Sequence, residues 1–236
     1  MSEHPKRLLL IFLKEPIAGK VKTRLAQTVG AEEAARIYQS LVSVLIQQLQ
    51  WMPDTEYRFC FAPADAGEAM QFWLLPQLSH RLEEGQVVPV GEGVPAVSFA
   101  PQCEGDLGEK MEDAFRQAFA EGFEEVGIIG TDCPYLSARW IETAWLSGRG
   151  RDLIVGPTYD GGYYFLGMKQ FTTAPFRGVP WSADNTLAKT LEQCEQAGLS
   201  VLQLPPLGDI DYEEDWLQAL ESPLGPKLKK ALEQAI

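Results

Sequence analysis

The chain has 236 residues and a mass of 26.2 kDa, and 45% of its residues are hydrophobic. This composition indicates a folded globular protein, with one large domain or two small ones. Its 20 Lys and Arg residues against 33 Asp and Glu residues give a net charge of −13, which repels nucleic acid and anionic membrane surfaces. We therefore expect neither as a partner, and any phosphate must be bound by a local group of cations.

The chain offers few residues for cysteine, histidine or membrane chemistry. The longest apolar run near the N-terminus, Leu8 to Leu13, is too short for a signal segment or a membrane span. Only His4 and His80 are present, so a nucleophilic site built on histidine would depend on His80. The four cysteines form no C-x-x-C pair, which fits reduced thiols. We expect a cytoplasmic protein that relies on carboxylates, lysines and arginines.

Short apolar runs alternate with helical stripes along most of the chain, which predicts an α/β fold. Strands are predicted over residues 7–13, 56–61, 97–100, 125–129, 153–156, 163–168 and 200–204. Helices are predicted over residues 32–50, 68–78, 107–119, 137–147, 183–197, 213–220 and 227–234. The segment Glu83–Ala96 is rich in Gly, Val and Pro and reads as a surface excursion.

A basic loop follows the first predicted strand. Lys14, Lys20, Lys22 and Arg24 lie within eleven residues of this acidic chain. A loop at the carboxyl end of a strand exposes backbone N–H groups, Gly19 permits close approach, and the cations can neutralise a pyrophosphate. The spacing is not that of a Walker loop. The alternative is a solvated basic turn.

Carboxylates follow two other predicted strands. Asp132 comes just after residues 125–129, where hard cations and phosphates bind at the edge of a sheet. Asp209 and Asp211 follow the last predicted strand, so one or both could meet Asp132 at a Mg²⁺ site. The alternative for Asp132 is a turn residue before Pro134.

Three positions have the spacing of helix caps. Asp106 with Glu109, and Asp211 with Glu214, match capping boxes at the starts of predicted helices. Ser182, just before another predicted helix, is interpreted as a cap. Capping is therefore an alternative to ligand binding at Asp106 and Asp211.

The segment Asp160–Tyr164 joins two predicted strands. An Asp-Gly pair in this position is by default a hairpin or turn. However, Asp160, Gly161, Gly162 and Tyr163 together are suited to hydrogen-bonding a polar substrate near a closely approaching backbone. Both interpretations remain open from the residues alone.

Five segments in order, covering nearly the whole chain, resemble the nucleotide-diphospho-sugar transferase superfamily. Within it, the chain is similar to glycosyltransferase-like proteins described as radical-SAM/selenodomain-associated transferases. The segments are Lys14-Glu15-Pro16 with Gly19-Lys20-Val21-Lys22-Thr23-Arg24-Leu25, Gln102-x-x-Gly105-Asp106-Leu107-Gly108-Glu109-Lys110-Met111, Gly130-Thr131-Asp132-Cys133-Pro134, Gly156-Pro157 with Asp160-Gly161-Gly162-Tyr163, and Asp209-Ile210-Asp211 with Glu214-Asp215. The chain departs from the family pattern at Lys110, where an arginine is usual, and in the length of the Glu83–Ala96 excursion.

The resemblance implies a GT-A fold over residues 1–236: a single Rossmann-like domain with a mixed, mostly parallel sheet and helices on both faces. It also implies a bound nucleotide and Mg²⁺ or Mn²⁺ as the cofactor. The implied catalytic residues are Lys22, Arg24, Asp132 and Asp160, and the implied metal ligands are Asp132, Asp209 and Asp211. The implied nucleotide-binding residues are Lys14, Gly19, Lys20, Thr23, Gln102, Gly105 and Asp106, and the acceptor would contact Gly161, Gly162, Tyr163 and Trp181.

The resemblance leaves the transferred group open. The basic loop looks like that of phospholactate guanylyltransferase, and Asp209-Ile210-Asp211 falls where molybdenum-cofactor guanylyltransferases carry Asn-x-Asn. Those relatives transfer nucleotidyl groups, which favours a metal-dependent nucleotidyltransferase acting on a nucleoside triphosphate and a small polar acceptor. The alternatives are a glycosyltransferase that uses a nucleotide sugar and a nucleotide-binding protein without catalytic activity.

Overall fold

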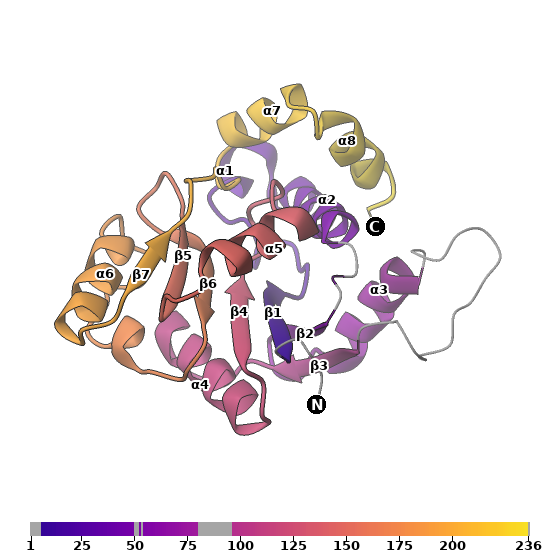
Figure 1. The fold of residues 1–236 in the computed structure, drawn as a ribbon. Coiled ribbons are helices and arrows are strands. Elements are labelled where there is room, and N and C mark those ends of the chain that lie inside the picture. The colour runs from indigo at the N-terminus through magenta and orange to yellow at the C-terminus, as the bar shows by residue number, and fades with distance from the viewer. Residues whose placement is uncertain (1–5, 50–51, 53, 80–95, 236) are drawn as a thin grey trace.

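In the computed structural model, residues 6–49, 52, 54–79 and 96–235 are described. His4, His80 and all of the Glu83–Ala96 excursion except Ala96 lie outside them. The described strands form one seven-stranded sheet in the order β3-β2-β1-β4-β6-β5-β7, in which β6 runs antiparallel to both of its neighbours (Figure 1). The strands are β1 (Arg7–Lys14), β2 (Thr55–Ala62), β3 (Val97–Pro101), β4 (Glu125–Ile129), β5 (Leu153–Pro157), β6 (Tyr163–Met168) and β7 (Val201–Gln203).

Helices cover both faces of this sheet, which confirms the predicted fold class. One face packs on α2, α3 and α5, and the other packs on α4 and α6. The helices α7 and α8 pack on α2 as an outer layer, next to the C-terminus in Figure 1. The described helices are α1 (Ala26–Val29), α2 (Ala31–Gln48), α3 (Gly67–Ser79), α4 (Leu107–Ala120), α5 (Ala138–Ser147), α6 (Thr186–Gln196), α7 (Glu213–Glu221), α8 (Gly225–Glu233) and the 3₁₀ turn Ala174–Phe176.

The first strand explains why the sheet needs two helical layers. Residues 8–13 are all buried, with alternate side chains in the two opposite core clusters. A strand buried on both faces is a continuous apolar run rather than an alternating pattern. The run predicted as a buried strand therefore lies in the middle of the sheet, between β2 and β4.

Two predictions about helix starts have different outcomes. The capping box at α4 is confirmed, because Asp106 accepts from the Glu109 N–H and the Glu109 carboxylate accepts from the Asp106 N–H. The cap at Ser182 is wrong. Its φ is +59°, and α6 begins only at Thr186, whose hydroxyl lies within hydrogen-bond distance of the carbonyl oxygens of Pro180 and Ala183.

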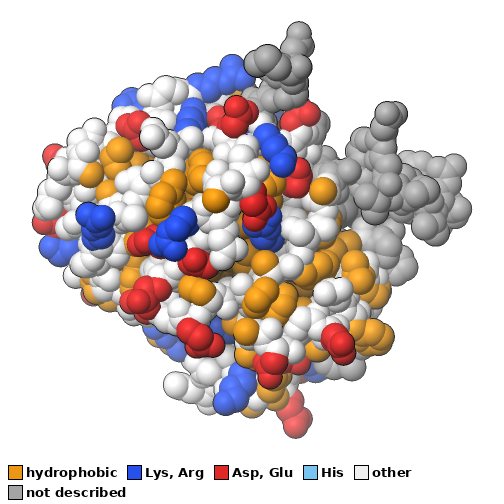
Figure 2. Space-filling model, turned by 90° about the horizontal axis from the view of Figure 1, so that it is seen from below, with side chains coloured by type: hydrophobic (Ala, Val, Ile, Leu, Met, Phe, Trp, Pro, Cys, Tyr) orange, Lys and Arg blue, Asp and Glu red, His pale blue; other side chains and the backbone are white. Residues whose placement is uncertain are grey.

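The edge of the sheet where β1 and β4 begin is rich in ion pairs. Arg7 Nε lies 2.6 Å from Glu125 Oε2, which joins the first residues of the two strands. Figure 2 views the molecule from this side, and acidic and basic side chains are interspersed with hydrophobic ones across it. None of the described helices has the length and apolar character needed to cross a membrane.

The loop before α7 is held in place by a buried isoleucine. Ile210 has no exposed surface, packs in the cluster formed by α2, α7 and α8, and donates its N–H to the Asp132 carbonyl at 2.9 Å. Ile210→Ala should lower the free energy of unfolding by about 2–5 kcal/mol, because truncation leaves a cavity. Leu217→Ala, on the exposed side of α7, should change it by only about 0.5 kcal/mol. Urea denaturation followed by circular dichroism tests both values, and equal effects would contradict the anchoring role.

Candidate functional site

A cavity of about 650 Å³ opens at the carboxyl ends of β1 and β4. Open α/β sheets bind ligands at this edge. Many of the site residues expected from the sequence line it: Lys14, Lys22, Thr23, Arg24, Gln102, Asp132, Asp160, Gly162, Tyr163, Trp181, Asp209 and Asp211. The other expected residues, Gly19, Lys20, Gly105, Asp106 and Gly161, are not among those that line it.

The Lys22 ammonium is buried, and three oxygen atoms of the protein surround it. Its side chain is 3% exposed, and Nζ lies 2.5 Å from Asp132 Oδ1, 2.5 Å from the Ile210 carbonyl oxygen and 3.4 Å from Asp211 Oδ1. An ammonium has three N–H donors, so three acceptors saturate it. Lys22 therefore holds the loop of residues 209–211 against the end of β4.

Arg24 and Lys14 keep access to the cavity. Arg24 Nη1 lies 2.8 Å from Asp211 Oδ2, yet its side chain is 48% exposed. Lys14 is exposed and lines the cavity, while its backbone N–H donates to the Tyr38 hydroxyl at 2.8 Å. These two side chains are the ones in the basic loop that both line the cavity and leave their cations accessible to an anion.

The helix cap proposed for Asp211 is wrong. Helix α7 begins at Glu213, and the Asp215 carboxylate accepts from the N–H groups of Asp211 and Tyr212 at 3.0 and 2.8 Å. The Asp211 side chain instead pairs with Lys22 and Arg24. Asp211 is therefore used for ion pairs with two cations, and Asp215 accepts the N–H groups before the helix in its place.

Three carboxylates converge beside this ion-pair group. Asp160, Asp209 and Asp211 each offer an oxygen within 4.8 Å of the others. Such hard oxygen ligands suit Mg²⁺ or Mn²⁺. The Asp160 carboxylate is already oriented, since its Oδ1 accepts from the Thr158 hydroxyl and the Gly162 N–H. The sequence had led us to expect Asp132 in this set, but Asp132 lies next to it, paired with Lys22.

Burial and neighbouring negative charges both raise the pKa of Asp209. Burial, followed by the charges of Asp160 and Asp211, raises the pKa of Asp209 to about 6. The charge of Lys22 lowers it only in part. A bound divalent cation would compensate the charges of Asp160 and Asp211 that contribute to this shift, so the residues fit the metal that the sequence suggests.

The turn at Asp160 packs tightly on the segment after Trp181, and of this segment the sequence had led us to expect only Trp181 at the site. Gly161 has φ +90°, and a Cβ there would lie 1.8 Å from the Asp184 carbonyl oxygen. The Leu187 N–H donates to the Gly161 carbonyl at 2.8 Å. Residues 181–184 and Thr186 line the cavity as a result. The helical stripe over residues 183–197 had hidden this loop.

The Tyr163 hydroxyl is directed into the core rather than offered to a ligand. It lies 3.9 Å from Met111 Sδ, and burial raises its pKa above the ordinary value. Tyr163 still lines the cavity, so any contact with an acceptor would use other atoms of the residue.

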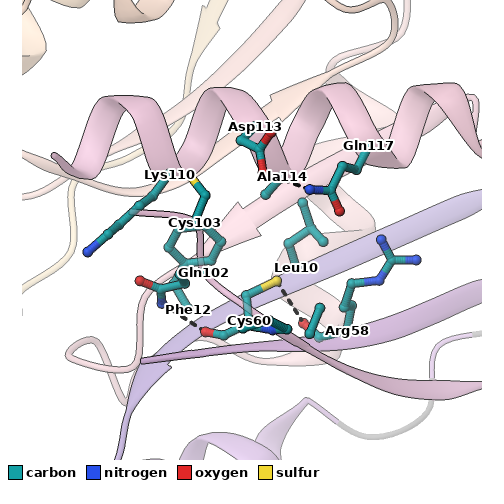
Figure 3. Close-up of a pocket in the computed structure, with 12 residues that line it drawn as sticks. Leu10, Phe12, Arg58, Cys60, Gln102, Cys103, Lys110, Asp113, Ala114 and Gln117 are labelled. Atoms are coloured by element: carbon teal, nitrogen blue, oxygen red, sulfur yellow. Dashed lines mark hydrogen bonds between the residues drawn. The ribbon is translucent and has the colours of Figure 1, made fainter. Parts of the chain in front are cut away.

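Gln102 joins the ends of two strands. Its side-chain amide donates to the carbonyl oxygen of Cys60 at 2.8 Å (Figure 3). It also donates to the carbonyl oxygen of Leu13 at 3.4 Å. The hollow drawn in Figure 3 lies beneath α4, next to Gln102 and Lys110. Its volume of about 10 Å³ is room for about one water molecule, so it is no substrate site.

Residues 45–183 match the family described as "Uncharacterized protein conserved in bacteria (DUF2064)", and the chain belongs to this family. It is similar over its whole length to a "putative nucleotide-diphospho-sugar transferase" from Desulfovibrio desulfuricans. The two chains are 30% identical, 98% of each is covered, and the TM-score is 0.79. None of the curated proteins matches the chain.

More distant solved structures share the fold. A cytidylyltransferase from Leptospira borgpetersenii is 14% identical, with 98% of this chain and 93% of that chain covered and a TM-score of 0.58. A 4-diphosphocytidyl-2C-methyl-D-erythritol synthase from Anaerococcus prevotii is 10% identical, with 91% and 96% covered and a TM-score of 0.53. These similarities confirm the GT-A fold expected from the sequence, and they show that the architecture is also cytidylyltransferase-like.

The raised pKa of Asp209 predicts how the stability of the folded protein changes with pH. Its folded pKa of about 6 exceeds the ordinary value of 3.8, so the folded state binds this proton more tightly than the unfolded state. The stability that it contributes is present below about pH 4 and is lost as the pH rises through 6. Without divalent cations, the melting temperature of the wild type should therefore fall relative to Asp209→Asn between pH 4 and 7. Parallel melting profiles of the two proteins over this range would contradict the prediction.

A second prediction concerns the buried ammonium. Lys22→Met should lower the free energy of unfolding by about 1–3 kcal/mol, less than for a fully buried pair because Asp132 is half exposed. Millimolar Mg²⁺ should recover part of this loss, since it supplies positive charge to the same carboxylates. Lys227→Met, at an exposed position on α8, is the control. Denaturant titrations with and without Mg²⁺ measure both effects. A Lys22→Met protein as stable as the control would show that Lys22 does not hold the loop of residues 209–211 in place.

Proposed function

We propose that this protein is a divalent-cation-dependent transferase that acts on an activated nucleotide, with nucleotidyl transfer to a small polar acceptor favoured. The observation that carries the proposal is the composition of one cavity. It joins the accessible cations Lys14 and Arg24 to the carboxylates Asp160, Asp209 and Asp211 at the carboxyl edge of the sheet.

The two accessible cations would bind the phosphates. The Arg24 guanidinium can exchange its contact with Asp211 for a charge-assisted contact with a phosphate oxygen, and Lys14 adds a second positive charge. The sequence suggests a catalytic role for Lys22, but in this geometry its ammonium would not contact the phosphates directly. Its saturated ammonium positions Asp132 and Asp211 and contributes its charge through them.

Asp160, Asp209 and Asp211 would hold the Mg²⁺ or Mn²⁺ ion. When bound, the ion supplies positive charge that stabilises the phosphate oxygens and the leaving group. The half-exposed Asp132, next to this cluster, is free to contact a water or a substrate group with the oxygen that Lys22 does not bind. Asp160 would also orient the acceptor, because it lines the same cavity together with Gly162 and Tyr163.

In nucleotidyl transfer, an oxygen of the acceptor forms a bond to the α-phosphorus, and the bond from that phosphorus to the bridging oxygen breaks. Pyrophosphate leaves with the bonding electrons, and the acceptor loses its proton to a nearby carboxylate or to water. Arg24 and Lys14 stabilise the charge that develops on the departing pyrophosphate. This demand for cations near the leaving group is what favours nucleotidyl over glycosyl transfer.

Glycosyl transfer from a nucleotide sugar is the second candidate. The description of the Desulfovibrio relative as a nucleotide-diphospho-sugar transferase favours it. Here the nucleotide diphosphate would be the leaving group, bound by the same cations. Incubation with isotopically labelled nucleoside triphosphates and nucleotide sugars, with Mg²⁺ or Mn²⁺, separates the two. Release of pyrophosphate supports the first reaction, and release of nucleoside diphosphate supports the second.

The phosphate role of Arg24 has a direct test. Arg24→Ala should weaken nucleotide binding in the presence of Mg²⁺ by about 1.5–3 kcal/mol, because a hydrogen bond to a charged group is lost. Arg149→Ala, at an exposed position after α5 and outside the cavity, should bind as the wild type does. Isothermal titration calorimetry gives both values. An unchanged Kd in folded Arg24→Ala would remove Arg24 from the phosphate site.

A further inference from the structure

The cavity has an apolar wall that the proposed chemistry does not use. Phe12, Met111 and Ile128 are buried and line the cavity from β1, α4 and β4. Leu107, in the first turn of α4, lines it as well and is 43% exposed. An exposed leucine beside buried apolar side chains gives the cavity a hydrophobic lining at this end.

Trp181 completes this wall. A Cβ on Gly108 would lie 2.3 Å from Trp181 Nε1, so the indole sits against the first turn of α4 at a position that only glycine leaves open. The ring centroid of Phe176 lies 6.5 Å from that of Trp181 on the core side. The indole is therefore supported from two sides while it lines the cavity.

The apolar wall belongs to the face of the sheet that α4 covers. Phe12, Met111 and Ile128 are members of the core cluster on the α4 side. Leu25 and Ile210, the chain neighbours of Arg24 and Asp211, belong instead to the cluster that contains α7. A molecule that fills the cavity can therefore contact both this apolar wall and the charged side chains of Arg24 and Asp211.

We infer that the second substrate is amphipathic: it carries a hydroxyl or phosphate group on a flat apolar body, and the body packs against Leu107 and Trp181. The segment that carries Trp181 packs on the Asp160–Gly162 turn, which places the wall on the acceptor side of the cavity. This inference rests on the proposed function, because it takes the basic loop as the site for the nucleotide phosphates.

Phenyl phosphate and inorganic phosphate are suitable probes, because they share the phosphate and differ in the ring. In the presence of Mg²⁺, the wild type should bind phenyl phosphate about tenfold more tightly than inorganic phosphate, since the ring is buried. Leu107→Ala and Trp181→Ala should each reduce this ratio toward one. Leu146→Ala is the matched control, because Leu146 is a similarly exposed leucine, on α5, that does not line the cavity.

The flat ring that packs on this wall could belong to the second substrate or to the nucleobase of the nucleotide. Binding of CTP and ATP to the same variants separates these two cases. The inference requires nucleotide affinity within about twofold of the wild type in Leu107→Ala and Trp181→Ala. It is overturned if the wild type binds phenyl phosphate and inorganic phosphate equally, or if the ratio of these two affinities is unchanged in Leu107→Ala. It is also overturned if nucleotide affinity falls together with this ratio, because the wall would then bind the nucleobase. A ring preference without nucleotide binding would contradict the proposed function and uphold the apolar subsite.

Discussion

The buried ammonium of Lys22 is the interaction on which the cavity depends. Five aspartates, at positions 132, 160, 184, 209 and 211, line one cavity of a protein whose net charge is −13. Such a concentration of like charge opposes folding unless a cation lies among them. Lys22, with φ +47° and a side chain that is 3% exposed, supplies that cation from a loop far away in the sequence. The loop after β1 thus stabilises the carboxylates as well as offering cations to a ligand.

Apolar patterning was sufficient to predict the sheet and most of its helices. Residues 163–168 were predicted as a strand with the bounds that β6 has, and the others differ by a few residues at most. The start of α6 was wrong because the stripe over residues 183–197 continues the helical pattern, whereas the hydroxyl of Thr186 closes a turn before the helix. The four-residue α1 was not predicted, since one turn is too short to show a periodic pattern.

The sequence indicated which segments would meet, but not how their side chains would pair. Lys22 and Arg24 are equivalent as cations in a motif, yet one is saturated and the other half exposed. Asp160 stands with Asp209 and Asp211 because Thr158 and the Gly162 N–H fix its carboxylate. The loop of residues 181–184 lines the cavity through its contact with Gly161. Such contacts depend on how distant loops pack, which local periodicity does not encode.

The balance of charge in the cavity also couples the two binding steps of the proposed reaction. A nucleoside triphosphate brings several negative charges to a site whose carboxylates already outnumber its accessible cations. Lys22 does not offset them, because its ammonium already contacts Asp132, Asp211 and the Ile210 carbonyl oxygen. A divalent cation at Asp160, Asp209 and Asp211 would offset that repulsion and draw Asp211 toward itself, which weakens its hold on Arg24. Cation and nucleotide binding are then coupled, and by linkage each increases the affinity for the other by the same factor. In the proposed reaction, the ion pair between Arg24 and Asp211 would hold the guanidinium in place until a phosphate and a cation together replace it.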